Sequence, residues 1–140
     1  MRASILSLLL LLSTSPQSQE DATVYFFREP KSETLVKYAI EVSCDGIKLG
    51  KLQPSRYFAV ALKPGKHVCR STEKSQKPIE LDLKANESRY FEMRTREHFF
   101  KFTGYLIPVG SEQGIEIIKT LRPSDRKDMR SELVTVPSRK

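Results

Sequence analysis

The sequence predicts a mainly all-β protein, an antiparallel β-sandwich of about seven or eight strands with a short C-terminal helix. Three observations predict this fold class. Short runs alternate apolar and polar residues, turn signals such as Asp-Gly and Pro-Gly separate the runs, and strands do not alternate with helices. At 140 residues, the chain has room for one domain with a modest core.

The N-terminal residues have the three-part layout of a secretory signal. Arg2 precedes an apolar run from Ile5 to Leu12, and small polar residues follow that run. A membrane-spanning helix needs roughly 20 apolar residues, so we expect no stable membrane anchor here. The protein is therefore expected to be secreted or periplasmic, with residues 1–19 as its signal peptide and cleavage near Ser18 or Gln19.

The first strands of the mature chain follow from local patterns. The run from Ala22 to Arg28 has apolar residues on both faces, which is typical of a central strand. A half-buried strand is expected from Tyr38 to Cys44, and the return strand of its hairpin from Ile47 to Leu52. Asp45-Gly46 lies between them and suits a two-residue type I′ turn, in which both residues have positive φ.

A second hairpin follows the first. Its strands are the alternating run from Phe58 to Leu62 and the run from Lys66 to Ser71. Pro64-Gly65 suits a type II turn, because proline presets φ at the first central position and glycine accepts the positive φ at the second.

Three further strands are expected after the hairpins, from Ile79 to Leu83, from Ser88 to Arg96 and from Phe99 to Pro108. The last two are aromatic-rich. Glu97-His98 lies between them as a tight turn, so these two strands form a third hairpin.

The period of the sequence changes at Ser111. Ser111 is placed to cap a helix, and apolar residues recur at helical spacing from Ile115 to Leu121 before Pro123. The alternative is a strand from Ile115 to Thr120, because β-branched isoleucines also suit strands.

The chain after the helix is polar. We expect the β-sandwich domain to cover residues 20–121 and residues 122–140 to form a partly disordered tail. A short helix or turn is expected near Ser124 to Arg130 within this tail.

Several of these turns, with their flanking strands, resemble a known family. The motifs are Cys44-Asp45-Gly46, Leu49-Gly50-Lys51-Leu52, Tyr57-Phe58, Leu62-Lys63-Pro64-Gly65-Lys66-His67 and the block from Leu83 to Phe91. They resemble the domain of unknown function 2846, a bacterial family of small exported domains, and more distantly the PEGA-type sandwich domains. The likeness covers about Ala22 to Leu121, although a glycine more usually precedes the aromatic pair of the last block. It implies a β-sandwich and no catalytic residues.

Cys44 and Cys69 are the only two cysteines. In an oxidising compartment they are expected to form a disulfide, which would stabilise the fold by about 3 kcal/mol in the chain-entropy model. The alternatives are two buried free thiols, or a metal-binding or nucleophilic cluster with His67, two residues from Cys69. Structural zinc needs four ligands, and only His98 remains to complete such a set. We therefore expect no metal and no cofactor.

Tyrosine and arginine recur next to each other and form the candidate ligand-binding set. The set is Tyr57, Tyr90, Tyr105, Arg56 and Arg89. Tyrosine and arginine are the residues that binding hot spots favour, and a sugar or a peptide would suit them. The alternative is structural: one aromatic of each Tyr-Phe pair belongs to the core, and the other covers the sheet surface.

The formal charge of +7 favours acidic partners such as an anionic polysaccharide, although the basic residues are spread along the chain. Without a basic stripe, nucleic acid is not an expected partner. No nucleophile or phosphate-binding motif appears, so no enzyme is expected. We expect a non-enzymatic binding or interaction module at the cell envelope, with an unknown protein or envelope polymer as its partner. The alternative is a small exported Cys/His metal-binding protein or enzyme.

Overall fold

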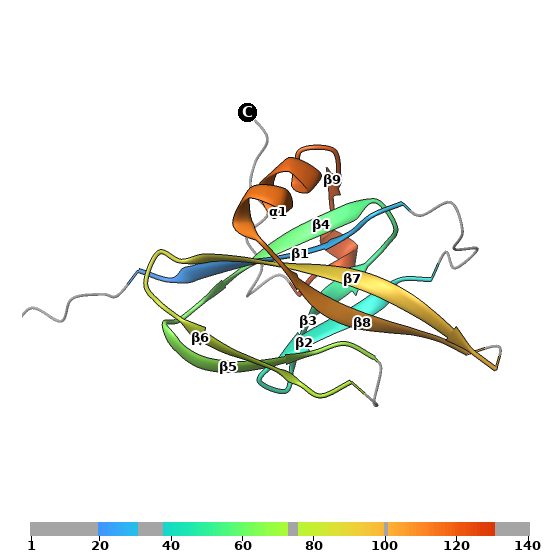
Figure 1. Ribbon diagram of the computed structural model, residues 1–140, viewed down its shortest axis with the longest axis horizontal. Helices are drawn as coiled ribbons and strands as arrows, with labels where there is room; N and C mark the ends of the chain where they lie inside the picture. Colours follow the sequence, from blue (N-terminus) through green and yellow to red (C-terminus); the bar gives the residue numbers. More distant parts are fainter. Residues whose placement is uncertain (1–19, 31–37, 73–75, 100, 131–140) are drawn as a thin grey trace, which may run out of the picture.

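Two β-sheets pack face to face in the computed structural model, which describes residues 20–30, 38–72, 76–99 and 101–130 (Figure 1). The elements are β1 (Ala22–Arg28), β2 (Ile40–Cys44), β3 (Ile47–Leu52), β4 (Arg56–Leu62), β5 (Gly65–Arg70), β6 (Ile79–Leu83), β7 (Ser88–His98), β8 (Lys101–Val109), α1 (Ser111–Ile118), β9 (Arg122–Pro123) and η1 (Arg126–Asp128). One sheet has the order β8-β7-β1-β4-β9, and the other has the order β3-β2-β5-β6. This confirms the predicted all-β class.

Strand β1 lies at the centre of the five-stranded sheet, as its two apolar faces predict. It pairs antiparallel with β4 along its whole length and parallel with β7. The pairing of β4 with β9 is also parallel, so this sheet is mixed. In both parallel pairs, the chain between the two strands passes through the other sheet before it returns.

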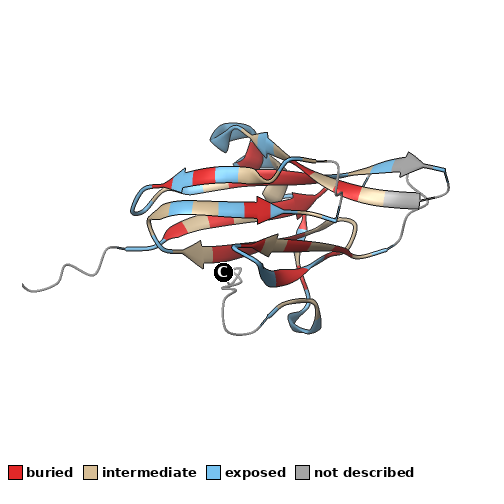
Figure 2. Cartoon of the chain, turned by 90° about the horizontal axis from the view of Figure 1, so that it is seen from below, coloured by how far each residue is buried: buried red, intermediate tan, exposed pale blue. Residues whose placement is uncertain are grey.

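The core lies between the sheets and is built from alternate residues of the strands (Figure 2). Phe26 at the middle of β1 has ring-centroid distances of 5.5 Å to Phe58 and 5.9 Å to Phe91. These three phenylalanines are buried, and leucines such as Leu49 and Leu81 of the other sheet complete the contact. Strands β2 and β6 bury the alternate residues that the sequence pattern predicts. Strands β4 and β7 each bury four consecutive residues, so both of their faces are covered.

Arg28 is a buried charge at the end of β1. Its Nη1 donates hydrogen bonds to the backbone carbonyls of Tyr38 at 2.6 Å and Leu52 at 3.1 Å. Burial lowers the pKa of Arg28, but these carbonyls compensate part of its desolvation. Arg28 thereby ties β1 to the other sheet.

At two sheet edges, other parts of the chain form hydrogen bonds or a bridge with the backbone of the edge strand. At the β8 edge, Gln76 Nε2 donates to the Leu106 carbonyl at 2.7 Å, and the Leu106 N–H donates to Gln76 Oε1 at 3.0 Å. At the β3 edge, Gly50 forms an antiparallel bridge with Met129. Such pairing blocks edge-to-edge association.

Helix α1 covers the outer face of the five-stranded sheet, and Figure 1 shows it on the same side of the molecule as β9. The helix is therefore confirmed and the alternative strand is wrong. The predicted cap is wrong too, because Gly110 is the N-cap and Ser111 is the first helical residue. Gly114 fits against the Tyr90 ring, where a Cβ would lie 2.5 Å from Cγ. Glycine here permits close helix packing that compensates its poor helix propensity.

Three predicted boundaries differ from the structure. Strand β2 begins at Ile40, and the side chain of Tyr38 is 72% exposed instead of lying on the buried face. Strand β7 continues through the predicted Glu97-His98 turn, and His98 pairs with Lys101. The folded domain also continues beyond Leu121, because β9 joins the sheet and η1 forms the expected short helix.

The predicted signal peptide, residues 1–19, and residues 131–140 of the predicted tail lie outside the described residues. Among the residues that the structure does describe, no helix has the length and apolar character to cross a membrane.

Candidate functional site

The two cysteines form a disulfide that joins the hairpins of the four-stranded sheet. Cys44 of β2 and Cys69 of β5 are register partners with a Cα–Cα distance of 4.0 Å. Only one further residue pair connects these two strands in register, so the covalent bond reinforces a short pairing. Because the sulfurs are bonded to each other, neither is available as a metal-binding or nucleophilic thiolate.

His67 bridges two turns beside this disulfide. Its Nδ1 lies 2.6 Å from Asp45 Oδ2, and its Nε2 lies 2.6 Å from the Lys63 carbonyl oxygen. Both partners are acceptors, so both ring nitrogens donate only in the imidazolium form. The alternative of a Cys/His cluster is therefore wrong, because the two sulfurs are bonded to each other and His67 pairs with a carboxylate. In the described ranges, no group of three His, Cys, Asp or Glu is suited to a metal.

The Asp45–His67 pair shifts the pKa values of both groups. Burial alone would lower the pKa of His67, but the hydrogen bonds to Asp45 and the Lys63 carbonyl, with the Asp45 charge, raise it. Burial alone would raise the pKa of Asp45, but hydrogen bonds from His67 and the Val68 N–H, with the His67 charge, lower it. Both shifts favour the ion pair. The pair holds the Asp45-Gly46 turn, where both residues have positive φ, against β5.

Two of the three predicted ligand-binding tyrosines meet on the outer face of the five-stranded sheet. Tyr57 and Tyr90 line a pocket of about 270 Å³ together with Tyr25, and Lys119 of the α1 C-cap lies at the same pocket. The Tyr25 and Tyr90 rings stack with a centroid distance of 4.8 Å and an interplanar angle of 7°. Burial and the neighbouring Tyr25 raise the pKa of Tyr90.

These tyrosines contribute mainly to packing. Tyr57 is 4% exposed and Tyr90 is 7% exposed, and both belong to a cluster with Phe27 and Leu121 under α1. Their rings therefore offer little surface to a ligand as large as a sugar. That these tyrosines bind a ligand stays a prediction.

The other members of the predicted set lie outside this pocket. Arg56 donates to the Pro123 carbonyl at 3.2 Å, and Arg89 lies 3.3 Å from Glu87. The guanidinium carbon of Arg96 lies over the Tyr105 ring, 4.7 Å from the ring centroid. The structure therefore brings together two residues of the predicted set, not all five.

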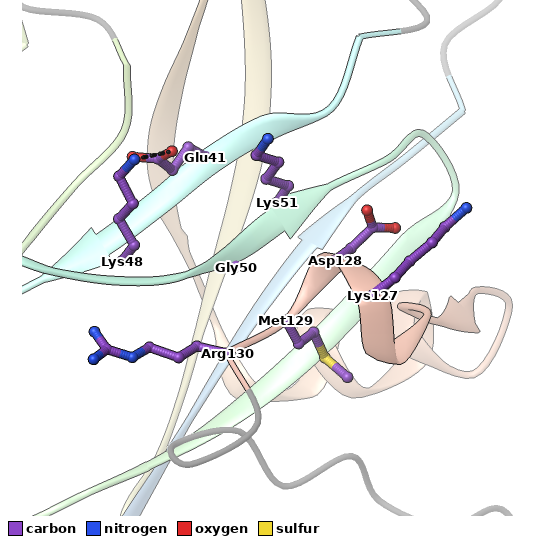
Figure 3. A pocket seen from close by; sticks show the side chains of 8 residues that line it. All are labelled: Glu41, Lys48, Gly50, Lys51, Lys127, Asp128, Met129 and Arg130. Atoms are coloured by element: carbon purple, nitrogen blue, oxygen red, sulfur yellow. Dashed lines mark ion pairs between the residues drawn. The ribbon is translucent and has the colours of Figure 1, made fainter.

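A larger and more polar site lies at the β3 edge, and we call it the β3 groove (Figure 3). Its volume is about 410 Å³. It is lined by Glu41, Lys48, Gly50, Lys51, Lys127, Asp128, Met129 and Arg130. Four cationic side chains thus face two carboxylates, and the formal charge of the lining is positive.

Two distant parts of the sequence build the β3 groove. One wall is β2 and β3, and the other is residues 126–130, which we call the C-terminal segment. Gly50 forms the contact between them, because a Cβ at this position would lie 2.9 Å from the Asp128 carbonyl oxygen. The Arg130 N–H donates to the Leu49 carbonyl at 3.1 Å, and Met129 packs against the main core.

The charges of the β3 groove are only partly compensated within the protein. Lys48 pairs with Glu41 at 3.4 Å, drawn as the dashed line in Figure 3. Lys51, Lys127 and Arg130 are exposed, and none has an ion pair with another residue of the described segments. Three cations are therefore available to an anionic ligand.

Sequence reasoning missed this site. Lys48 and Lys51 were predicted as strand residues, and residues 122–140 as a tail with little to bury. The signal that pointed here was Gly50 inside a strand pattern, because an isolated strand glycine often marks a close backbone approach.

The fold and the site define a β-sandwich with an internal disulfide and a basic groove at one sheet edge. Comparison with known proteins found no matching family model, no matching curated protein and no matching solved structure. The resemblance to the domain of unknown function 2846 therefore stays a prediction.

Proposed function

We propose that the protein is a non-enzymatic binding module at the cell envelope, secreted or periplasmic, and that its β3 groove binds an anionic envelope polymer. The observation that carries this proposal is the lining of the groove, with four cationic side chains and two carboxylates around about 410 Å³. This volume is in the usual range of ligand sites, about 300 to 1,000 Å³.

Charge complementarity supports a polymer rather than a single small ion. Exposed ion pairs contribute little individually, about 0.2 to 1 kcal/mol each. A polymer with repeated anionic groups contacts several cations at once. After its first group binds, the next groups are held close to the other cations, so the total affinity exceeds that of one contact. Because the cations are exposed, binding of this kind weakens as salt is added.

The proposed location rests on two features. Disulfides such as Cys44–Cys69 are typical of oxidising compartments outside the cytoplasm. The N-terminal sequence also has the layout of an export signal. Both features support the proposal of a partner in the cell envelope.

The test is binding to three polymers: inorganic polyphosphate, polygalacturonate and neutral dextran. We expect the protein to bind the two anionic polymers and not dextran. In K51Q/R130Q, which removes one cation from each wall, affinity for polyphosphate should fall about 2- to 30-fold, from two contacts of about 0.2 to 1 kcal/mol each.

The matched control is K66Q/K77Q, which removes the same charge from exposed positions outside the groove. This variant should keep nearly the affinity of the unmodified protein. Equal losses in the two double variants would contradict the proposal, because binding would then follow the net charge and not the β3 groove.

A further inference from the structure

The C-terminal segment supplies half of the β3 groove, namely Lys127, Asp128, Met129 and Arg130. Two of the four groove cations are therefore on a segment that must dock on β3 before the groove exists. The site is complete only when this segment is in place.

The docking of this segment on β3 depends on few contacts. The backbone contributes the Gly50–Met129 bridge and the hydrogen bond from the Arg130 N–H to the Leu49 carbonyl. The Met129 side chain adds an apolar contact with the main core. The other backbone hydrogen bonds of the segment, from the N–H groups of Asp128 and Met129, stay within residues 125–129.

Two features oppose docking, and a bound anion offsets only the second of them. Asp128 Oδ2 is buried and has no hydrogen-bond partner among the described residues, which is unfavourable for a carboxylate. Docking also brings Lys127 and Arg130 to a groove that already contains Lys48 and Lys51. Like charges at one site repel each other unless an anion lies between them.

From this balance we infer that a multivalent oxyanion of the phosphate type, bound in the β3 groove, holds the C-terminal segment on β3. The inference rests on the proposed function and adds the regulation of the same site. An anion that contacts cations of both walls binds the docked form more tightly than the undocked form. By linkage, docking and anion binding strengthen each other by the same factor.

Amide hydrogen exchange with inorganic polyphosphate as the probe tests this inference. The reporter of docking is the N–H group of Arg130, which donates to the Leu49 carbonyl of β3, whereas the Met129 N–H bonds to Arg126 and reports only the local order of the segment. If only the docked form binds, exchange slows by a factor of 1 + [L]/Kd, about 100-fold at a hundred times Kd. Sodium chloride at the same ionic strength should not produce this protection.

Two glycine variants separate docking from general stability. In G50A, the added Cβ meets the Asp128 carbonyl, so the Arg130 N–H should exchange rapidly even with polyphosphate, and affinity should fall. G110A is the control, because Gly110 has no atom within 4 Å of an added Cβ and no positive φ. It should exchange and bind like the unmodified protein. Core amides of β1 report that both variants are folded.

The outcomes distinguish the inference from the proposed function. Polyphosphate binding with unchanged exchange at Arg130 would overturn the inference and leave the proposed function intact. Unchanged affinity in G50A would overturn it as well. If the unmodified protein does not bind polyphosphate or polygalacturonate, both the inference and the proposed function are wrong.

Discussion

Reduction of the Cys44–Cys69 disulfide should destabilise the fold by an amount that follows from its place in the chain. The cysteines are 25 residues apart. In the chain-entropy model, opening a loop of this length lowers the free energy of unfolding by about 3.5 kcal/mol. This value refers to the unfolded chain, so it does not depend on the native contacts between β2 and β5, which share two register pairs.

The assay is urea unfolding of the protein with and without reductant. Reduction keeps both sulfur atoms in the core, so the measured difference contains no cavity contribution. The slope of the unfolding free energy against urea should also rise, because a chain without the cross-link exposes more surface when unfolded. C44A/C69A is the control, because reductant should not change its stability.

Two results would refute this reasoning. A loss below about 1 kcal/mol on reduction would show that the cross-link does not constrain the unfolded chain as the model requires. Alkylation of both cysteines in the native protein without reductant would show that the disulfide itself is absent.

Three further perturbations test other parts of the fold. The raised pKa of His67 means that its pairing with Asp45 stabilises the fold fully below the ordinary value of 6.5 and is lost as pH rises through the folded value. The free energy of unfolding should therefore fall with rising pH above about 6.5, and H67Q should flatten this dependence; an identical pH profile in H67Q would contradict the assignment. G114A places a Cβ 2.5 Å from the Tyr90 ring, so urea unfolding should show a loss of about 1 to 3 kcal/mol, and unchanged stability would contradict the close packing of α1. Q76A exposes unpaired backbone groups at the β8 edge, so light scattering should show more self-association, and unchanged scattering would contradict the protection of this edge by Gln76.

The strands could be predicted from the sequence where local signals are strong. The bounds of β1, β3 and β6 agree with the expectation because alternation and turn residues such as Asp45-Gly46 act over a few residues. The sequence also predicts Gly50 within β3, but it does not predict that Gly50 is buried.

The differences arise where distant contacts decide the structure. Tyr38 continues the alternation of β2 but is exposed, because alternation alone does not show where the partner strand ends. The helix cap moved from Ser111 to Gly110 because the chain leaves β8 in an extended conformation, with ψ of 149° at Gly110. The predicted tyrosines are not all neighbours, because the order of strands in the sheet decides which of them meet. Tyr57 and Tyr90 line one pocket, and Tyr105 lies elsewhere, against Arg96.

The β3 groove was beyond prediction because it depends on one contact between Gly50 and Met129. Neither residue carries charge, and a glycine inside a strand indicates a close backbone approach without showing which segment approaches. Only the return of the chain to β3 after η1 brings Lys127 and Arg130 to the β3 lysines. A charge pattern along the sequence does not contain this information.

The most direct test of the central claim is the affinity for polyphosphate measured over a range of salt concentrations. The account predicts that log K falls linearly with log salt, and that K51Q/R130Q lowers the steepness of this line by about 1.5, from two lost contacts of about 0.7 to 0.9 each. K66Q/K77Q should keep the original slope. The same slope and affinity in K51Q/R130Q and in the unmodified protein would contradict the claim that the β3 groove is the binding site.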